Sequence, residues 1–469
     1  MLEPALESSR PTPIQTQICD RLRTLVANGQ LKAGDRLPSL RAFSGELGVA
    51  RGTVEAAYAR LIGEGYLEAR GARGTFVAQG VRAAGPAPDA TVAPSAASQP
   101  AAPGIGKLQL GVPALDAFPR KVWARQVARR ARAASGLHHP SPCGFPPLRE
   151  ALAAYLHRSR GVACAADQVM IVPGYVAAIG LIGQTLLSPG AKVWVESPGY
   201  PPTSRTFERL GMSLVGVPVD AQGIQVEQGM RHGADARLAV VTPSHQSPLG
   251  VPMSMSRRTA LLAWAGSAGA WIVEDDYDGE FRYTGHPLPA LKSLDRADRV
   301  IYAGTFSKVL FPGLRIAYLV VPRRLVASFE RVCEAGIWGH CPELLQAATH
   351  DFIIEGHFAR HVKKMRTLYA VRRSHLADAL RRQCGTGIRI HLTEGGMHLL
   401  VGTPPGVADV ELVRRARAAG FGIRALSEWA GPGQALEGLL MGFTNLRSAE
   451  EANAQVAELL RAFSGARAA

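Results

Sequence analysis

The chain has 469 residues, 47% of them hydrophobic and 19% charged, which is the balance of a folded globular protein rather than a disordered one. It has no apolar run near the ~18 residues that span a bilayer, and its first residues do not resemble a secretory signal. Six cysteines are scattered without metal-type spacing, which predicts free thiols. We therefore expect a cytoplasmic protein with no membrane contact.

The formal net charge of +15 and the isoelectric point of about 9.9 indicate an anionic partner such as nucleic acid. The excess is uneven along the chain. Residues 1–80 carry 10 Lys and Arg against 8 Asp and Glu, whereas residues 107–469 carry 42 against 29. This distribution fits a basic surface on the C-terminal part that touches DNA or another polyanion. It equally fits an arginine-rich surface that is only solvated.

A change of composition divides the chain. Ala, Pro, Gly and Ser fill 19 of the 26 positions in 81–106, and five of those positions are proline. Such a segment buries too little surface to offset its ordering entropy, and its prolines favour a semi-extended tether. We therefore predict an N-terminal domain over 11–80, a linker over 81–106 and a C-terminal domain over 107–469.

The N-terminal segment predicts three helices and a hairpin. Apolar side chains in 14–26 recur at spacings of three and four, which is typical of a helix with one buried stripe. A second short helix opens at Pro38, and a third is predicted over 51–64. The extended segments 66–69 and 75–78 follow, joined by a short basic turn. This order is that of a winged helix-turn-helix.

Such a fold places the helix after the turn in the DNA major groove. Its first residues, Arg51, Gly52 and Thr53, would then face base edges, and Arg51 is suited to guanine. Arg41 would contact the phosphate backbone, and Arg73 in the hairpin turn would reach a groove edge. The alternative is an ordinary three-helix packing module whose arginines are only solvated.

The amino-acid sequence of this segment is more specific than the order of its predicted elements. The string GQLKAGDRLPSLRAFSGELGVARGTVEAAYARLIGEGYLEARGARGTFV resembles the GntR-type winged-helix DNA-binding domain, and the resemblance covers about 11–79. Ala50 departs from it, because such domains often carry serine there as a helix N-cap. A missing cap typically costs ~1 kcal/mol.

The C-terminal domain alternates short apolar runs, such as VWVE, LAVV and WIVEDD, with longer helix-like stretches, which predicts an α/β domain with a mainly parallel sheet. In VIYAGTFSKVLFPGLRIAY, a strand-like run ends before Thr305, Ser307 and Lys308, and Arg315 follows. A phosphate-bearing aldehyde needs an amine for a Schiff base, with hydroxyl and guanidinium partners for its phosphate. The alternative is a surface loop with a solvated lysine.

A second strand-like run, WIVEDDYDGEF, ends in an acidic cluster. Asp275 there could keep a pyridine nitrogen protonated, and Tyr277 could hydrogen-bond a ring hydroxyl. The alternative is a divalent-metal site, since clustered carboxylates also bind Mg²⁺. The separate lysine and the acid–aromatic–acid order favour a pyridoxal site.

Three further segments fit a pyridoxal ring. Tyr200 follows a strand-like run and is suited to stacking on a flat ring. Gln246, in PSHQSPLG, offers a polar group to a ring oxygen. Gly174, Tyr175 and Val176 precede a helix whose free N–H groups could hold a phosphate.

Together these segments resemble fold-type I, class I aminotransferases, most closely the MocR-type regulators that join a GntR winged helix to such a domain. The resemblance implies an α/β fold-type I PLP-dependent domain, usually dimeric, with pyridoxal 5'-phosphate as cofactor and Lys308 as the internal aldimine lysine. It also implies a cofactor shell: Asp275 at the ring nitrogen, Tyr277 at the ring hydroxyl, Tyr200 on the ring face, and Thr305, Ser307, Arg315 and the 174–176 turn at the phosphate.

One departure bears on function. Aminotransferases place an arginine just before the Gly-Phe pair of the segment LLMGFTNLR, where it binds the substrate carboxylate, and this chain has Leu440 and Met441 there. Arg447 lies out of register. Arg424 and His398 are possible substitutes that are better explained as structural or solvated residues.

We therefore expect a transcriptional regulator that binds an operator duplex as a homodimer, carries PLP on Lys308 and senses a small amine or amino acid. A working aminotransferase with a DNA-binding appendage is the second interpretation. A regulator whose large domain only dimerises, or that senses PLP itself, is the third.

Overall fold

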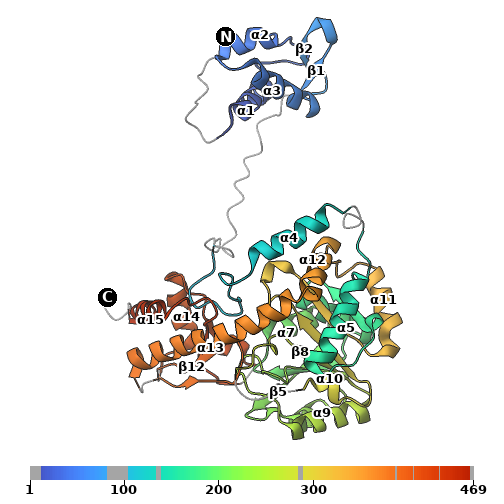
Figure 1. Cartoon of the computed structure of the whole chain (residues 1–469), viewed down its shortest axis with the longest axis vertical. Coiled ribbons are helices and arrows are strands. Elements are labelled where there is room, and N and C mark those ends of the chain that lie inside the picture. Colours follow the sequence, from blue (N-terminus) through green and yellow to red (C-terminus); the bar gives the residue numbers. More distant parts are fainter. Residues whose placement is uncertain are drawn as a thin grey trace. The chain divides into compact units, whose positions relative to one another are not determined.

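The computed structural model describes residues 12–81, 104–133, 139–283, 289–385, 388–404, 406–431 and 434–464. The chain divides into two compact units, residues 1–101 and 102–469 (Figure 1). The linker predicted over 81–106 stays a prediction, because 82–103 lie outside the described residues. Within the described parts, no helix has both the length and the apolarity to cross a membrane.

The first unit is a winged helix-turn-helix, as the sequence predicts. Three helices precede a two-stranded antiparallel hairpin in which Leu67 lies opposite Val77. The elements are α1 (Ile14–Ala27), α2 (Leu40–Leu47), α3 (Arg51–Gly63), β1 (Leu67–Ala69), the 3-10 turn η1 (Gly71–Arg73) and β2 (Thr75–Val77). The predicted ends are each within a residue or two of these bounds.

Local chemistry explains where these helices begin and end. The hydroxyl of Ser39 accepts a hydrogen bond from the N–H of Ala42 at 3.2 Å, so Ser39 rather than Pro38 is the N-cap of α2. Gly48 ends α2 in the left-handed region at φ +64°. Helix α3 starts without a side-chain cap at Ala50. Its start therefore depends on packing, through the buried Val54 and Leu61.

The second unit is built on an eight-stranded sheet of order β3-β10-β9-β8-β7-β4-β5-β6. Five neighbouring strands, from β9 to β5, run parallel, while β10 is antiparallel to both of its neighbours and β6 is antiparallel to β5. The strands are β3 (Val169–Val172), β4 (Lys192–Ser197), β5 (Ser213–Asp220), β6 (Gly223–Ile224), β7 (Leu238–Val241), β8 (Trp271–Asp276), β9 (Val300–Thr305) and β10 (Ala317–Val320).

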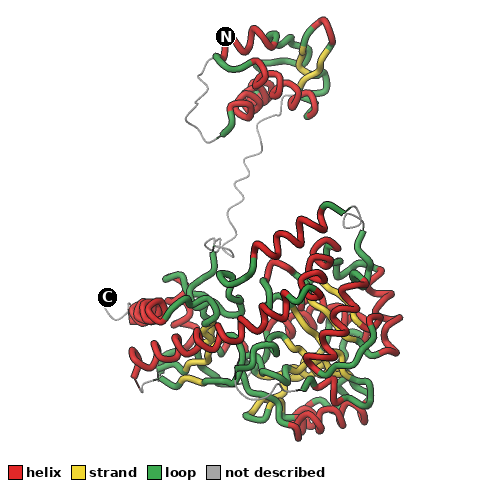
Figure 2. Tube along the Cα trace, viewed as in Figure 1, coloured by secondary structure: helices red, strands yellow, loops and turns green. Residues whose placement is uncertain are grey.

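Helices surround this sheet, and a smaller antiparallel sheet of order β11-β12-β14-β13 follows in the C-terminal part (Figure 2). The helices are α4 (Arg120–Ala131), α5 (Pro146–Arg160), α6 (Tyr175–Leu186), α7 (Pro201–Arg209), α8 (Val226–His232), α9 (Met255–Ala268), α10 (Leu291–Leu294), α11 (Val326–Glu334), α12 (Glu343–Ile354), α13 (His357–Cys384), α14 (Asp409–Ala418) and α15 (Ala449–Ser464). The small-sheet strands are β11 (Ile390–His391), β12 (His398–Val401), β13 (Arg424–Ala425) and β14 (Leu439–Gly442).

The central strands are covered on both faces, so they are continuous apolar runs rather than alternating ones. All four residues of β7 are buried, as are the last five of β8. Because parallel strands end at one edge of a sheet, the polar residues that follow β4, β7, β8 and β9 collect there. This edge carries the candidate site.

Candidate functional site

Lys308 lies three residues beyond the end of β9, and its amine is buried. It donates a hydrogen bond to the carbonyl oxygen of Gly111 at 2.8 Å. Gly111 has φ +75°, and a Cβ on it would lie 2.5 Å from the amine. Burial lowers the pKa of Lys308, while Asp278 and Asp275 oppose that shift. A buried amine with a lowered pKa is suited to attack a carbonyl.

The acidic run at the end of β8 sends its side chains to different partners. Glu274 accepts hydrogen bonds from the backbone N–H groups of Leu291 and Lys292 at 2.7 and 2.8 Å. Asp276 pairs with Arg160 at 2.6 Å. Among the described residues, no group of three or more His, Cys, Asp or Glu side chains is placed to hold a metal ion. The divergence of these carboxylates favours the pyridoxal interpretation of the run.

Asp275 forms no ion pair with any residue in the described part of the chain. Burial raises its pKa to about 8, a hydrogen bond from Tyr175 opposes that shift, and Asp276 and Glu196 add to it. The Tyr175 ring lies 5.7 Å from that of Tyr200. One pocket is lined by Asp275, Tyr175 and Tyr200 but not by Lys308. A buried carboxyl of this kind would gain from a cationic group such as a protonated ring nitrogen.

Tyr277 lies beside the loop that follows β7. Its hydroxyl is 3.0 Å from Nδ1 of His245, and it also hydrogen-bonds Ser247. Gln246 turns away from it. The Gln246 amide donates to Glu196 and Pro198 and accepts from the N–H of Leu249. In this structure, Ser247 and His245 rather than Gln246 are the loop side chains that hydrogen-bond the Tyr277 hydroxyl.

Of the predicted phosphate residues, Arg315 contacts the turn at the start of α6, while Thr305 and Ser307 contact each other at the end of β9. Arg315, in the left-handed region at φ +53°, donates to the carbonyl oxygen of Pro173 at 3.2 Å. A Cβ on Gly174 would lie 2.5 Å from the Arg315 guanidinium, so only glycine lets the arginine approach this turn. The N–H of Ser307 donates to the hydroxyl of Thr305 at 3.1 Å. Val176 is exposed.

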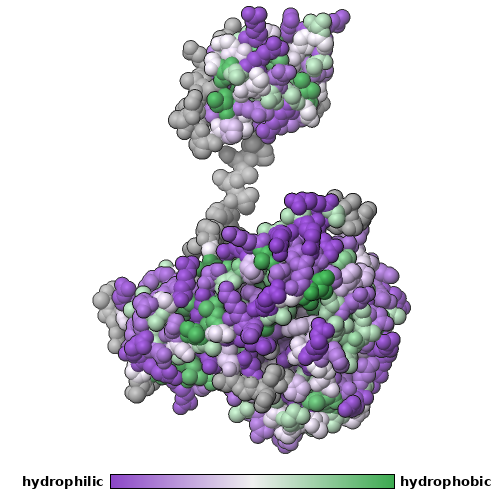
Figure 3. Space-filling model, in the orientation of Figure 1, coloured by the Kyte–Doolittle hydropathy of each residue, from purple (hydrophilic) through white to green (hydrophobic). Residues whose placement is uncertain are grey.

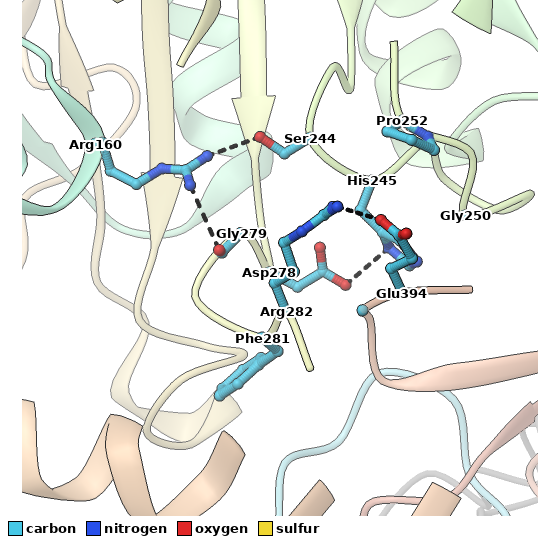
Figure 4. Close-up of a pocket in the computed structure, with 11 residues that line it drawn as sticks. Arg160, Ser244, His245, Gly250, Pro252, Asp278, Gly279, Phe281, Arg282 and Glu394 are labelled. Atoms are coloured by element: carbon cyan, nitrogen blue, oxygen red, sulfur yellow. Dashed lines mark hydrogen bonds and ion pairs between the residues drawn. The ribbon is translucent and has the colours of Figure 1, made fainter. Parts of the chain in front are cut away.

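Two histidines lie near Tyr277, and the sequence assigned neither of them a role at the cofactor. His245 contacts Tyr277, and His398 lies beside His245. His245 lies 3.1 Å from Asp278 and 3.3 Å from the hydroxyl of Thr393. His398 lies with its ring 5.9 Å from that of His245, and burial together with His245 lowers its pKa to about 4. Figure 4 shows His245 turned toward Asp278 at a pocket edged by the Arg282–Glu394 ion pair. His398 is therefore neutral at physiological pH.

The position of the missing arginine is filled by apolar side chains. Leu440 and Met441 are both buried in β14. Arg447 and Arg424 are exposed. Arg372 is buried, but it pairs with both carboxylate oxygens of Asp116, at 3.0 and 2.6 Å. In the described part of the chain, none of these arginines is placed as a free carboxylate clamp on β14.

In the first unit, the arginines predicted to contact DNA differ from neighbouring arginines in their ion pairing. Arg23 and Arg60 both pair with Glu64. Arg41, Arg51 and Arg73 form no ion pair with any residue in 12–81, so their charges are not neutralised within the unit. Gly52 is exposed beside Arg51 at the start of α3, and Thr53 is half-buried.

Comparison with known proteins agrees with these two units. Residues 14–77 match the family of bacterial regulatory proteins of the gntR type, and residues 105–427 match aminotransferase class I and II. The chain is 37% identical over 465 residues to the probable rhizopine catabolism regulatory protein MocR of Rhizobium meliloti, covering 94% of this chain and 92% of that one. It is 36% identical to the pyridoxine biosynthesis transcriptional regulator PdxR of Corynebacterium glutamicum, covering 94% of each.

The chain belongs to the MocR-type transcriptional regulators of the GntR family. The second unit also resembles solved aminotransferases. The kynurenine aminotransferase of Pyrococcus horikoshii superposes with a TM-score of 0.69 and 27% identity, covering 78% of this chain and 92% of that one. Aminotransferases of this class depend on PLP, so this family membership implies PLP, and the GntR unit implies an operator duplex as partner.

Sequence reasoning missed two residues of the site. Gly111 lies 197 residues before the lysine it contacts, within a stretch that has no motif of its own. Ser247 stands next to the residue that was chosen, and only the direction of the loop separates them. The serine–proline pair at 247–248 was the one available signal, because proline restricts the residue before it.

Proposed function

We propose that this regulator holds PLP at Lys308 and uses it to detect a small primary amine, which changes the grip of its winged helices on an operator. The observation that carries the proposal is the buried, pKa-lowered amine of Lys308 at the same sheet edge as the buried carboxyl of Asp275, which forms no ion pair with a described residue. A lysine in a solvated loop would keep its ordinary pKa and would have no reason to meet such a carboxyl.

The residues present fit PLP. Asp275 supplies the negative charge that a protonated ring nitrogen requires, and its own raised pKa would fall on gaining that cation. Tyr277 and Ser247 would bind the ring hydroxyl. Arg315 and the Gly174 turn would hold the phosphate. When bound, the cofactor supplies an electrophilic aldehyde and an electron sink.

The buried Leu440 and Met441 favour sensing over turnover. An aminotransferase gains specificity and rate from a bidentate clamp on the substrate carboxylate. Here the matching positions are apolar, while neutral His398 and the hydroxyl of Thr393 lie close to His245. A site of this kind suits an amine recognised through neutral hydrogen bonds, or PLP itself as the signal.

Regulation requires a difference in affinity between two states. An amine changes DNA binding only if it binds two conformations of the second unit unequally. We infer a homodimer, because two winged helices would then read two half-sites. Arg51, Gly52 and Thr53 would face bases, while Arg41 and Arg73 would contact the backbone or a groove edge.

A spectral titration tests the proposal. The PLP-loaded chain is titrated with ethanolamine, alanine and taurine, which share a primary amine and differ in their second group. We expect a shift of the near-visible band for at least one of them and a matching change in affinity for a duplex from a selected binding site. Steady conversion of amino acid and keto acid would instead support the aminotransferase alternative. If no amine shifts the near-visible band and only PLP changes the affinity for the duplex, the result would support direct sensing of PLP.

A further inference from the structure

Helix α4 of the second unit is strongly basic and has no role in the site described above. Between Asp116 and Glu150 the sequence has no acidic residue and seven Lys or Arg residues. Six of these seven lie between Arg120 and Arg132, on α4 or at its C-cap. Figure 3 shows hydrophilic residues gathered over α4 on the second unit.

The helix uses its two sides differently. On the inner side, Arg130 donates to Asp351 at 2.7 Å, and the exposed Arg129, at the edge of the outer side, donates to Glu355 at 2.8 Å, so both residues fix α4 to α12. On the outer side, Lys121, Arg125 and Arg132 are exposed and form no ion pair with any residue in the described ranges. These three outer residues are called the α4 stripe below.

The α4 stripe is linear. At 3.6 residues per turn, its members fall within ~40° of one another around the helix. They span 11 residues, or ~16 Å along the axis. Duplex DNA carries one charge per ~1.7 Å of its axis, so a stripe of this length matches several phosphates.

We propose that the α4 stripe binds the phosphate backbone of the duplex that the winged helices read. The inference rests on the DNA binding of the proposed function. Two arguments select DNA as the occupant. The stripe is positively charged, whereas the DNA backbone is negatively charged. No carboxylate in the described ranges pairs with the three cations, so no ion pair has to be broken before they bind phosphate. In addition, DNA held by the first unit raises the local concentration of phosphate around the second unit of the same chain.

The salt dependence of binding provides the test, since phosphate contacts are independent of sequence. The PLP-loaded full chain and the triple variant Lys121→Ser/Arg125→Ser/Arg132→Ser are titrated onto a mixed-sequence 60-bp duplex between about 50 and 200 mM salt. Each lost contact should reduce the slope of log affinity against log salt by about 0.9. Three lost contacts predict that the wild-type chain loses ~40-fold more affinity than the variant over this range.

A matched control removes the same charge elsewhere. Arg209, Arg231 and Arg417 are exposed and form no ion pair with a described residue. The triple variant Arg209→Ser/Arg231→Ser/Arg417→Ser should keep the wild-type slope. Equal slopes for wild type and the stripe variant would overturn the inference, as would equal losses in both triple variants, which would indicate bulk charge alone.

Two further outcomes distinguish the α4 inference from the proposed DNA binding on which it rests. If the wild-type chain binds no duplex at all, the proposed DNA binding fails. If it binds, and Arg51→Ala weakens it while the stripe variant does not, only the α4 inference fails. A change of sedimentation in the stripe variant would show instead that α4 joins two copies of the chain. Unchanged cofactor absorbance and melting temperature confirm that both triple variants are folded.

Discussion

The contact between Gly111 and Lys308 gives the sharpest prediction. In Gly111→Ala, the new Cβ would lie 2.5 Å from the lysine amine, which must move by about 0.9 Å to reach ordinary contact at 3.4 Å. If the methyl group also crowds Lys308 when the lysine carries PLP, the side chain must leave its preferred rotamer, at a cost of roughly 0.5–1.5 kcal/mol. We therefore expect PLP to bind about 2- to 13-fold more weakly.

A matched glycine separates this effect from backbone strain. Gly190 has φ +84°, close to the +75° of Gly111, but no atom lies within 4 Å of its virtual Cβ. Both alanine variants should lose roughly 1–2 kcal/mol of stability from the left-handed backbone. Only Gly111→Ala should weaken the near-visible absorbance titration with PLP. If the two variants bind PLP equally well, Lys308 reaches the cofactor without passing Gly111, and this description of the site is incorrect.

The other predictions concern single side chains. Lys308→Ala should abolish the near-visible absorbance of the PLP-loaded chain, and an unchanged spectrum would refute its assignment. Arg51→Ala should weaken binding to a selected operator by ~1–3 kcal/mol if Arg51 contacts a base in bidentate fashion, as a gel-shift titration would show. The pKa of Asp275 in the folded, cofactor-free chain is about 8, above the ~3.9 of an unfolded chain, so the folded state holds an extra proton between these values. Stability of the cofactor-free protein should therefore fall as pH rises through that window. Asp275→Asn should flatten this decline in thermal melts, and an equally steep decline would exclude Asp275 as its source.

The sequence predicted the framework of the site better than its interior. The runs at β4, β7, β8 and β9 were recognised because buried parallel strands are continuous apolar segments, and the residues after them could be assigned to one sheet edge. The roles predicted for Lys308 and Asp275 came from the resemblance to aminotransferases, because the residue types alone left a solvated loop and a metal site open.

What the sequence could not supply is direction and distance within loops. Gln246 and Ser247 are adjacent, and the hydrogen bonds of Gln246 to Glu196 and Pro198 decide which of them turns to Tyr277. Those partners lie about 50 residues away in sequence, so no local pattern encodes the choice. The same holds for Gly111, whose backbone oxygen rather than its residue type makes the contact with Lys308.

This chain keeps the residues suited to a cofactor but has apolar residues where an aminotransferase binds the substrate carboxylate. Lys308, Asp275 and Arg315 keep the groups that would hold PLP under the proposed function, and each is supported by a specific contact or by burial. On β14, Leu440 and Met441 are buried where a clamp would be needed. Binding energy that an aminotransferase spends on orienting its substrate is thus missing, whereas reversible capture of an amine needs only the lysine-bound cofactor. A regulator gains from this difference, because a signal that is captured but not consumed leaves an occupancy set by its concentration relative to its Kd, and occupancy is what can bias two conformations.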